Sequence, residues 1–285
     1  MCAILLTSVT VSLAQSQKPG SKPDSDVQLL VRPHVGDTLW LQLEQTIDTR
    51  AIPVSSERQP EFGPVRDQGQ SQSVNMRMFA HSLVEASDLR MTSMVAITDS
   101  LNVRAGTVGS LGPSRPMSVA PADRSVRVRV TPEGAMSVVD PHPGTMALDA
   151  SLQGMPAMLP TKPVSVGDEW ERDIAMPSVP MFGIRADGVV HAEFHLDSIT
   201  RGGRLAYVSM KGTLRREGAA RDLTPGSQIV TSGHLRGYLV LDRTRGWITE
   251  AETIIQVQSD VTARPGDKNP ARSFDIRLTQ RMKVR

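Results

Sequence analysis

An alternation of apolar and polar residues with a period of two recurs along most of this chain. The clearest case is the segment 274–284, in which Phe274 and Ile276 alternate with Asp275 and Arg277. The same pattern occupies residues 39–47, 74–84, 126–130 and 206–214. Such a run places apolar side chains on one face of a strand and polar side chains on the other. Strands of this kind form antiparallel sheets with one face open to water, so we predict a mainly β protein.

A short motif that occurs twice divides the chain into two similar parts. Val35-Gly36-Asp37 and Val166-Gly167-Asp168 are each closely followed by a tryptophan. We predict that each motif is a turn leading into a strand, in which glycine supplies conformational freedom and aspartate caps the turn. A second similarity relates residues 95–101 to residues 194–199. These similarities predict two related β halves, at 28–144 and 161–285.

Residues 237–257 have the pattern of a β-hairpin. Two apolar-rich segments flank a turn at 242–246 that ends in Gly246, which fits a type I turn closed by a residue with positive φ. On the second strand we expect Trp247, Ile255 and Val257 to share one face.

The segment 145–160 interrupts the period of two and is predicted to connect the halves. Four apolar residues in it recur at helical spacing, namely Leu148, Leu152, Met155 and Leu159. Gly154 and Pro156 interrupt that spacing, so we predict a short central helix near 145–154 with an irregular end.

The first fourteen residues carry no charge and contain a short apolar run followed by the small residues Ser12 and Ala14. This pattern is typical of a secretory signal peptide at 1–14, followed by a flexible tether at 15–27. The only cysteine, Cys2, lies in this segment, so the mature chain would form no disulfide and no cysteine-ligated metal site. We therefore expect a periplasmic or secreted protein, and no other segment reaches transmembrane length.

The charge of the chain argues against nucleic acid as a partner. The formal net charge is +2, which is small for a nucleic-acid-binding protein. Acidic residues prevail in 28–100 and basic residues prevail near the C-terminus. The basic end is either a solvated strand face or a weak patch for anionic partners.

One strand-like segment could carry metal chemistry. On a strand, His191, Glu193 and His195 point to the same face, and two imidazoles with a carboxylate can ligate zinc while leaving a position for water. The alternative is an ordinary polar strand face that holds histidines. The sequence shows no nucleophile elbow and no phosphate-binding loop, so it offers no positive argument for an enzyme and predicts no cofactor.

Methionine is frequent, at 14 residues, whereas aromatic residues make up only 4% of the chain. Methionine either fills a core or lines a surface that accepts varied apolar ligands. The candidate ligand-binding residues are Leu148, Leu152, Met155, Met158 and Met210.

The Val-Gly-Asp-x-Trp motif, the predicted central helix and the Gly-Tyr-Leu-Val-Leu-Asp-x-x-x-Gly-Trp hairpin together resemble an exported bacterial β-sheet domain family of unknown function, which is distantly similar to lipoprotein-carrier half-barrels. The resemblance implies an antiparallel curved sheet, or a half-barrel, that cradles the helix and binds acyl chains. It implies no catalytic residues.

Three functions follow as hypotheses. The first is a non-enzymatic cell-envelope protein that binds an apolar ligand, such as a lipid, or an envelope protein partner in the β cradle. The second is a metal-dependent hydrolase or metal-binding protein that uses His191, Glu193 and His195. The third is a structural or interaction module that pairs through an exposed edge strand at Ser273–Arg285.

Overall fold

The computed structural model shows a protein whose described regular elements are all β-strands. It describes residues 26–52, 71–113, 115–116, 125–139, 157–175, 180–181, 184–185, 189–219, 228–262 and 272–285. The prediction of a mainly β, antiparallel protein is confirmed. Within these ranges no helix is long and apolar enough to cross a membrane. The helix predicted near 145–154, the signal peptide and residues 15–25 of the tether lie outside the described residues.

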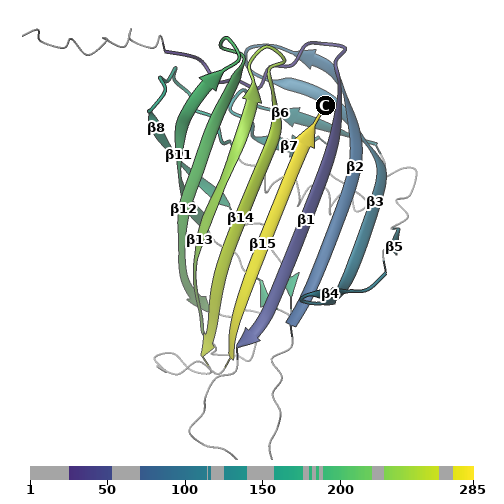
Figure 1. Cartoon of the computed structure of the whole chain (residues 1–285), viewed down its shortest axis with the longest axis vertical. Helices are drawn as coiled ribbons and strands as arrows, with labels where there is room; N and C mark the ends of the chain where they lie inside the picture. Colours follow the sequence, from purple (N-terminus) through teal and green to yellow (C-terminus); the bar gives the residue numbers. More distant parts are fainter. Residues whose placement is uncertain are drawn as a thin grey trace, which may run out of the picture.

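Thirteen of the described strands form one open sheet (Figure 1). The strands are β1 (Thr38–Ile52), β2 (Ser71–Ser87), β3 (Thr92–Thr107), β4 (Ser110–Leu111), β5 (Arg115–Pro116), β6 (Ser125–Val130), β7 (Met136–Val138), β8 (Glu169–Ala175), β9 (Pro180–Met181), β10 (Ile184–Arg185), β11 (Val189–Thr200), β12 (Leu205–Ala219), β13 (Gln228–Asp242), β14 (Trp247–Thr262) and β15 (Arg272–Val284). Their order is β7-β6-β3-β2-β1-β15-β14-β13-β12-β11-β8, with β4 and β5 paired to β3. Strands β9 and β10 form a separate pair.

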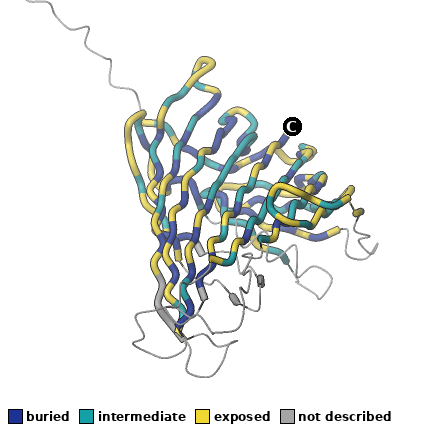
Figure 2. Tube along the Cα trace, turned by 60° about the horizontal axis from the view of Figure 1, so that its bottom comes forward, coloured by how far each residue is buried: buried dark blue, intermediate teal, exposed yellow. Residues whose placement is uncertain are grey.

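The sheet is strongly curved. Figure 1 shows β6 and β7 lying behind the row of long strands, and Figure 2 shows buried and exposed residues alternating along the strands. Burial alternates in this way because apolar and polar residues alternate along the sequence of each strand.

The last strand, β15, lies in the middle of the sheet. It pairs with β1 over twelve residues and with β14 over twelve residues. The expectation that Ser273–Arg285 is an exposed edge strand is therefore wrong, because both of its edges are already hydrogen-bonded. The same ladder joins the first strand to the last, so the two predicted halves belong to one continuous sheet.

The turn before β1 has the predicted geometry. Gly36 has a φ of 89°. Its N–H donates to the carbonyl oxygen of Val84 at 2.9 Å, and the N–H of Val84 donates to the carbonyl oxygen of Asp37 at 3.0 Å. The carboxylate of Asp37 accepts the backbone N–H of His34 at 3.0 Å. The turn therefore starts the β1–β2 ladder and is capped by its own aspartate.

The turn before β8 repeats this geometry bond for bond. Gly167 has a φ of 97° and donates to the carbonyl oxygen of Leu196 at 2.9 Å, and the N–H of Leu196 donates to the carbonyl oxygen of Asp168 at 3.0 Å. The carboxylate of Asp168 accepts the N–H of Ser165 at 2.8 Å. The β8–β11 pair thus corresponds to the β1–β2 pair. The second sequence similarity does not follow this correspondence, since residues 95–101 lie on β3 and residues 194–199 on β11.

The hairpin predicted at 237–257 is formed by β13 and β14. Thr249 has no partner in the register, because Val240 pairs with Glu250 and Leu241 pairs with Ile248. Such a bulge shifts the alternation by one residue. Trp247, Ile248, Ile255 and Val257 are all buried members of the same core cluster.

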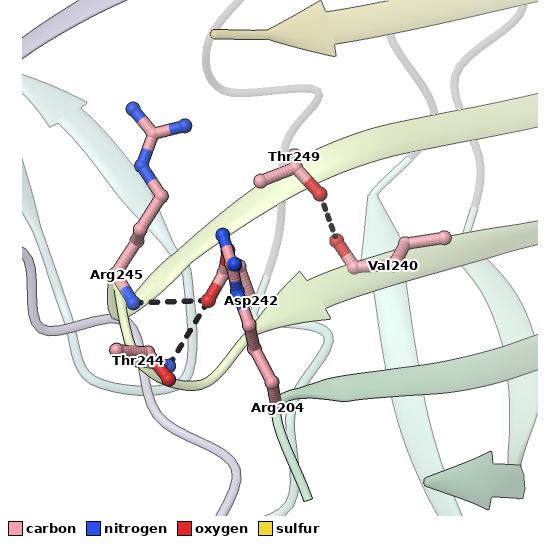
Figure 3. Close-up of polar contacts among 6 residues, drawn as sticks. All are labelled: Arg204, Val240, Asp242, Thr244, Arg245 and Thr249. Carbon is pink, nitrogen blue, oxygen red and sulfur yellow. Dashed lines mark hydrogen bonds and ion pairs between the residues drawn. The ribbon is translucent and has the colours of Figure 1, made fainter. Parts of the chain in front are cut away.

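A buried aspartate organises the turn of this hairpin (Figure 3). One carboxylate oxygen of Asp242 accepts the backbone N–H groups of Thr244 and Arg245, both at 3.1 Å. The other accepts Nε and Nη2 of Arg204 at 3.0 and 2.7 Å. Burial raises the pKa of Asp242, but the hydrogen bonds from Arg204 and from the two backbone groups outweigh it, so the pKa lies below the usual value.

We predict that Gly36→Ala and Gly167→Ala each lower the free energy of unfolding by about 1–2 kcal/mol, because a Cβ is strained at positive φ. Neither glycine has a neighbouring atom within 4 Å of the new Cβ, so the cost is conformational and not steric. Urea denaturation measures both variants. Val35→Ala in the same turn is the control and should change stability by less than about 0.5 kcal/mol. If the two alanine variants lost very different amounts of free energy of unfolding, the two turns would not be equivalent.

We predict that Asp242→Asn lowers the free energy of unfolding at pH 7 by about 2 kcal/mol. The lowered pKa of Asp242 means that its stabilisation is present above its unfolded-state pKa and is lost as the pH falls below about 4, through the folded-state pKa. The gap between wild type and variant should therefore narrow at acidic pH. Urea denaturation at several pH values tests this, with the exposed Asp275→Asn as control. A gap that does not change with pH would contradict it.

Candidate functional site: the concave face of the sheet

The inner face of the curved sheet carries the main core. One cluster of buried apolar residues includes side chains from β6 at one end of the sheet order and from β8 and β11 at the other. Its fully buried members include Val130, Val190, Phe194, Leu196, Val208, Leu239 and Leu241. This surface, which we call the concave face, runs across the whole sheet.

Three segments bring the two ends of the sheet together at one end of the molecule. Glu133, which follows β6, accepts backbone hydrogen bonds from Met158 and Leu159, which precede β8, both at 3.0 Å. Residues 26–34 cross the same end, where Val31 donates to the carbonyl oxygen of Pro132 at 2.8 Å. These contacts cover one end of the concave face with protein.

The wall of the concave face at β8, β11 and β12 holds two of the predicted ligand-binding residues. Met210 lies opposite Phe194 in the β11–β12 register, and Phe194 stacks on Trp170 with the ring centres 5.7 Å apart. The indole N–H of Trp170 donates to the carbonyl oxygen of Met158 at 2.8 Å. The structure thus brings Met158 and Met210 to the same wall, and both are buried. Leu148, Leu152 and Met155 lie outside the described residues.

A row of polar residues crosses the middle of the concave face. Gln45 on β1 pairs with Gln280 on β15, which pairs with Thr253 on β14. All three are half-buried and share the face of buried neighbours such as Leu43 and Met282. Sequence reasoning passed over them, although Gln45 and Gln280 each interrupt the apolar side of a clear alternation. They supply hydrogen-bonding groups on an otherwise apolar surface.

Arg172 is a second residue that sequence reasoning missed. It lies on β8 opposite Ala192, which is fully buried on the concave face. Its Nη2 donates to the carbonyl oxygen of Leu159 at 2.7 Å, while its Nε is buried and, in the described part of the chain, has no hydrogen-bond partner. A buried N–H of this kind is a donor that the protein does not use.

The residues of the metal hypothesis lie on the opposite, convex face. His191 contacts Asp173 at 2.6 Å, Glu193 contacts Lys211 at 2.9 Å, and His195 contacts Asp197 at 2.7 Å. The three side chains share a face as predicted, but each turns to a different partner. Among the described residues no group of three histidine, cysteine or acidic side chains is close enough to hold a metal ion. The arrangement gives the metal hypothesis no support.

One basic residue of β15, Arg281, is paired on the convex face. Arg281 forms an ion pair with Glu252 on β14 at 3.0 Å, and the next strand over, β1, offers Glu44 at the position opposite Arg281. Glu44 in turn contacts Arg77 on β2 at 2.7 Å. Opposite charges therefore alternate across these strands, which favours a solvated strand face over a patch for anionic partners.

We predict that His191, Glu193 and His195 do not bind zinc together, because each side chain lies in a separate contact. Isothermal titration with zinc chloride measures this. His195→Ala should leave the melting temperature nearly unchanged with or without zinc. One-to-one binding that His195→Ala removes would contradict the geometry and restore the metal hypothesis.

Comparisons with known proteins bear on the fold. No protein-family model matches the chain, and no curated protein matches it in sequence. A solved structure described as "Lipid-protein interactions in lipovitellin" aligns with a TM-score of 0.50 and 9% sequence identity, over 88% of this chain and 25% of that chain. DynF from the dynemicin biosynthesis pathway of Micromonospora chersina aligns over 94% of this chain and 92% of that chain at 8% identity, but its TM-score of 0.24 carries no argument.

This chain spans about a quarter of the lipovitellin chain that it matches. At this identity the likeness concerns the fold alone, and it agrees with the expected lipid-carrier-like β fold. Membership of an exported bacterial family stays a prediction. Over most of its length, the chain is similar in fold to one part of lipovitellin.

Proposed function

We propose that this protein binds an apolar ligand of the lipid or acyl-chain class on the concave face of its sheet. The observation that carries the proposal is the continuous apolar surface from β6 to β8, which is covered by protein at one end. Removal of apolar surface from water is the main favourable term for binding such a ligand, at about 25 cal/mol for each Å² buried. The likeness to a structure concerned with lipid–protein interactions supports the proposal at the level of fold.

The polar row of Gln45, Thr253 and Gln280 suits a ligand that is apolar with a few polar atoms. Amide and hydroxyl groups donate and accept hydrogen bonds without carrying charge, so they can contact an ester or hydroxyl group of a lipid. Lipid pockets are lined by apolar side chains with a small number of such groups. The unused N–H of Arg172 adds a donor on the same face.

The sheet edges favour a lipid over a protein partner that adds a strand. The two ends of the sheet order are β7, with three residues, and β8, with seven, whereas the long strand β15 is central. A short edge strand offers few backbone groups for pairing. A non-enzymatic role in the cell envelope completes the proposal, and it rests on the export predicted from residues 1–14.

We predict that Gln45→Lys weakens lipid binding roughly tenfold or more, because it places an unpaired charge on the apolar concave face. Gln42→Lys is the matched control: it lies on the same strand, is also half-buried and faces the convex side, so binding should stay within about twofold. A pyrene-labelled diacylglycerol is a suitable probe, since it carries no charge that lysine could attract. Fluorescence titration of the full chain gives the dissociation constants.

Native mass spectrometry of the purified protein provides an independent test. An apolar adduct that denaturation releases would support the proposal. A bare protein that also fails to bind the pyrene probe, or equal effects of the two lysine variants, would overturn it.

A further inference from the structure

A pocket of about 530 Å³ lies outside the concave face, where residues 28–35 cross the turn between β13 and β14. Residues 28–35 lie between the pocket and the concave face, and their side chains point alternately to one and to the other. Leu29 and Val31 are buried in the core cluster, whereas the alternate residues Gln28, Leu30 and Arg32 line the pocket. A volume of this size matches that of a small-molecule site.

Two arginines give the pocket a positive charge. Arg32 and Arg243 both line it, and none of its ten lining residues is an aspartate or glutamate. The carboxylate next to the turn, Asp242, is already engaged by Arg204. Among the described residues, neither lining arginine forms an ion pair with a carboxylate. His34 adds little, because its imidazole lies 3.5 Å from Asp37.

The turn holds Arg243 in place without using all of its donors. The backbone N–H of Arg243 donates to the carbonyl oxygen of Arg204 at 2.8 Å, and Nη1 donates to the carbonyl oxygen of Gly203 at 2.5 Å. Its Nε is buried and has no hydrogen-bond partner among the residues that the structure describes. Asp242 fixes the neighbouring backbone, as Figure 3 shows for Thr244 and Arg245. A pre-organised guanidinium with an unused donor is suited to an oxyanion.

The remaining lining residues indicate what the oxyanion is attached to. Ser87 and Thr244 offer hydroxyl groups, while Leu30 and Val35 form an apolar side. The volume exceeds what a bare ion requires. The carboxylate of Asp88, which follows Ser87, accepts the backbone N–H groups of Arg90 and Met91, and these bonds, with a smaller contribution from Arg32, lower its pKa.

We propose that this pocket binds a phosphomonoester group, carried by a small organic molecule or by a lipid such as phosphatidic acid. Two arginines match the charge of the dianion, and the hydroxyl groups and apolar side accommodate the rest of the molecule. The site is separate from the concave face, so this inference does not depend on the proposed function.

The test uses the full chain and offers the phosphomonoester group in two forms, on a small soluble molecule and on a lipid. Isothermal titration measures phenyl phosphate against phenol, and vesicle flotation compares phosphatidylcholine with and without phosphatidic acid. Arg32→Gln and Arg243→Gln should each weaken binding roughly tenfold or more. Arg245→Gln is the control, because Arg245 belongs to the same turn but does not line the pocket, and its side chain points away from Asp242 in Figure 3. Its effect should stay within about twofold.

Binding of phenyl phosphate but not phenol, lost in both pocket variants and kept in Arg245→Gln, would support a soluble ligand. Binding only to vesicles that contain phosphatidic acid, with the same dependence on the variants, would support the lipid source. Binding of neither form, or equal losses in all three arginine variants, would overturn the proposal. Arg32 is exposed, so Arg32→Gln keeps the test valid if Arg243→Gln fails to fold.

Discussion

A single sheet with one apolar face has to shield that face from water. This sheet does so by curving, so that the segments next to its two ends contact each other. The contacts of Glu133 with Met158 and Leu159 join the region after β6 to the region before β8, although these strands lie near opposite ends of the sheet order. The concave face, its covered end and its polar row all exist because of this curvature. Without it, the same strands would expose their valines, leucines and methionines to solvent.

Glycines on β13 are part of how the backbone accommodates that shape. A Cβ at Gly233 would lie 2.3 Å from the carbonyl oxygen of Gln256, and a Cβ at Gly237 would lie 2.1 Å from that of Glu252. Only glycine allows the two backbones to approach so closely, and glycine inside a strand often marks such a bend. Gly237 pairs with Met210 on one side and with Thr253 of the polar row on the other. The local backbone and the candidate site are therefore linked.

The two proposed sites use the two sides of one segment. Residues 26–34 bury alternate side chains against the core and present the others to the pocket, so a single extended segment helps to close the concave face and to form the charged pocket. The convex face, by contrast, pairs its charges across strands, as Arg281 does with Glu252.

Local pattern was sufficient for the strands and turns. Alternation depends only on neighbouring residues, so it located β1, β2, β6, β12 and β15, and the Val-Gly-Asp motif predicted two turns that proved to have the same hydrogen bonds.

Tertiary structure alone decided which strands became neighbours. β15 reads as an edge strand but lies in the centre, because β1, from the other end of the chain, pairs with the edge that the preceding strand β14 leaves free. The bulge at Thr249 brought Ile248 opposite Leu241, because one extra residue shifts the register. The row of Gln45, Thr253 and Gln280 came together only through strand register, which no single strand's sequence contains.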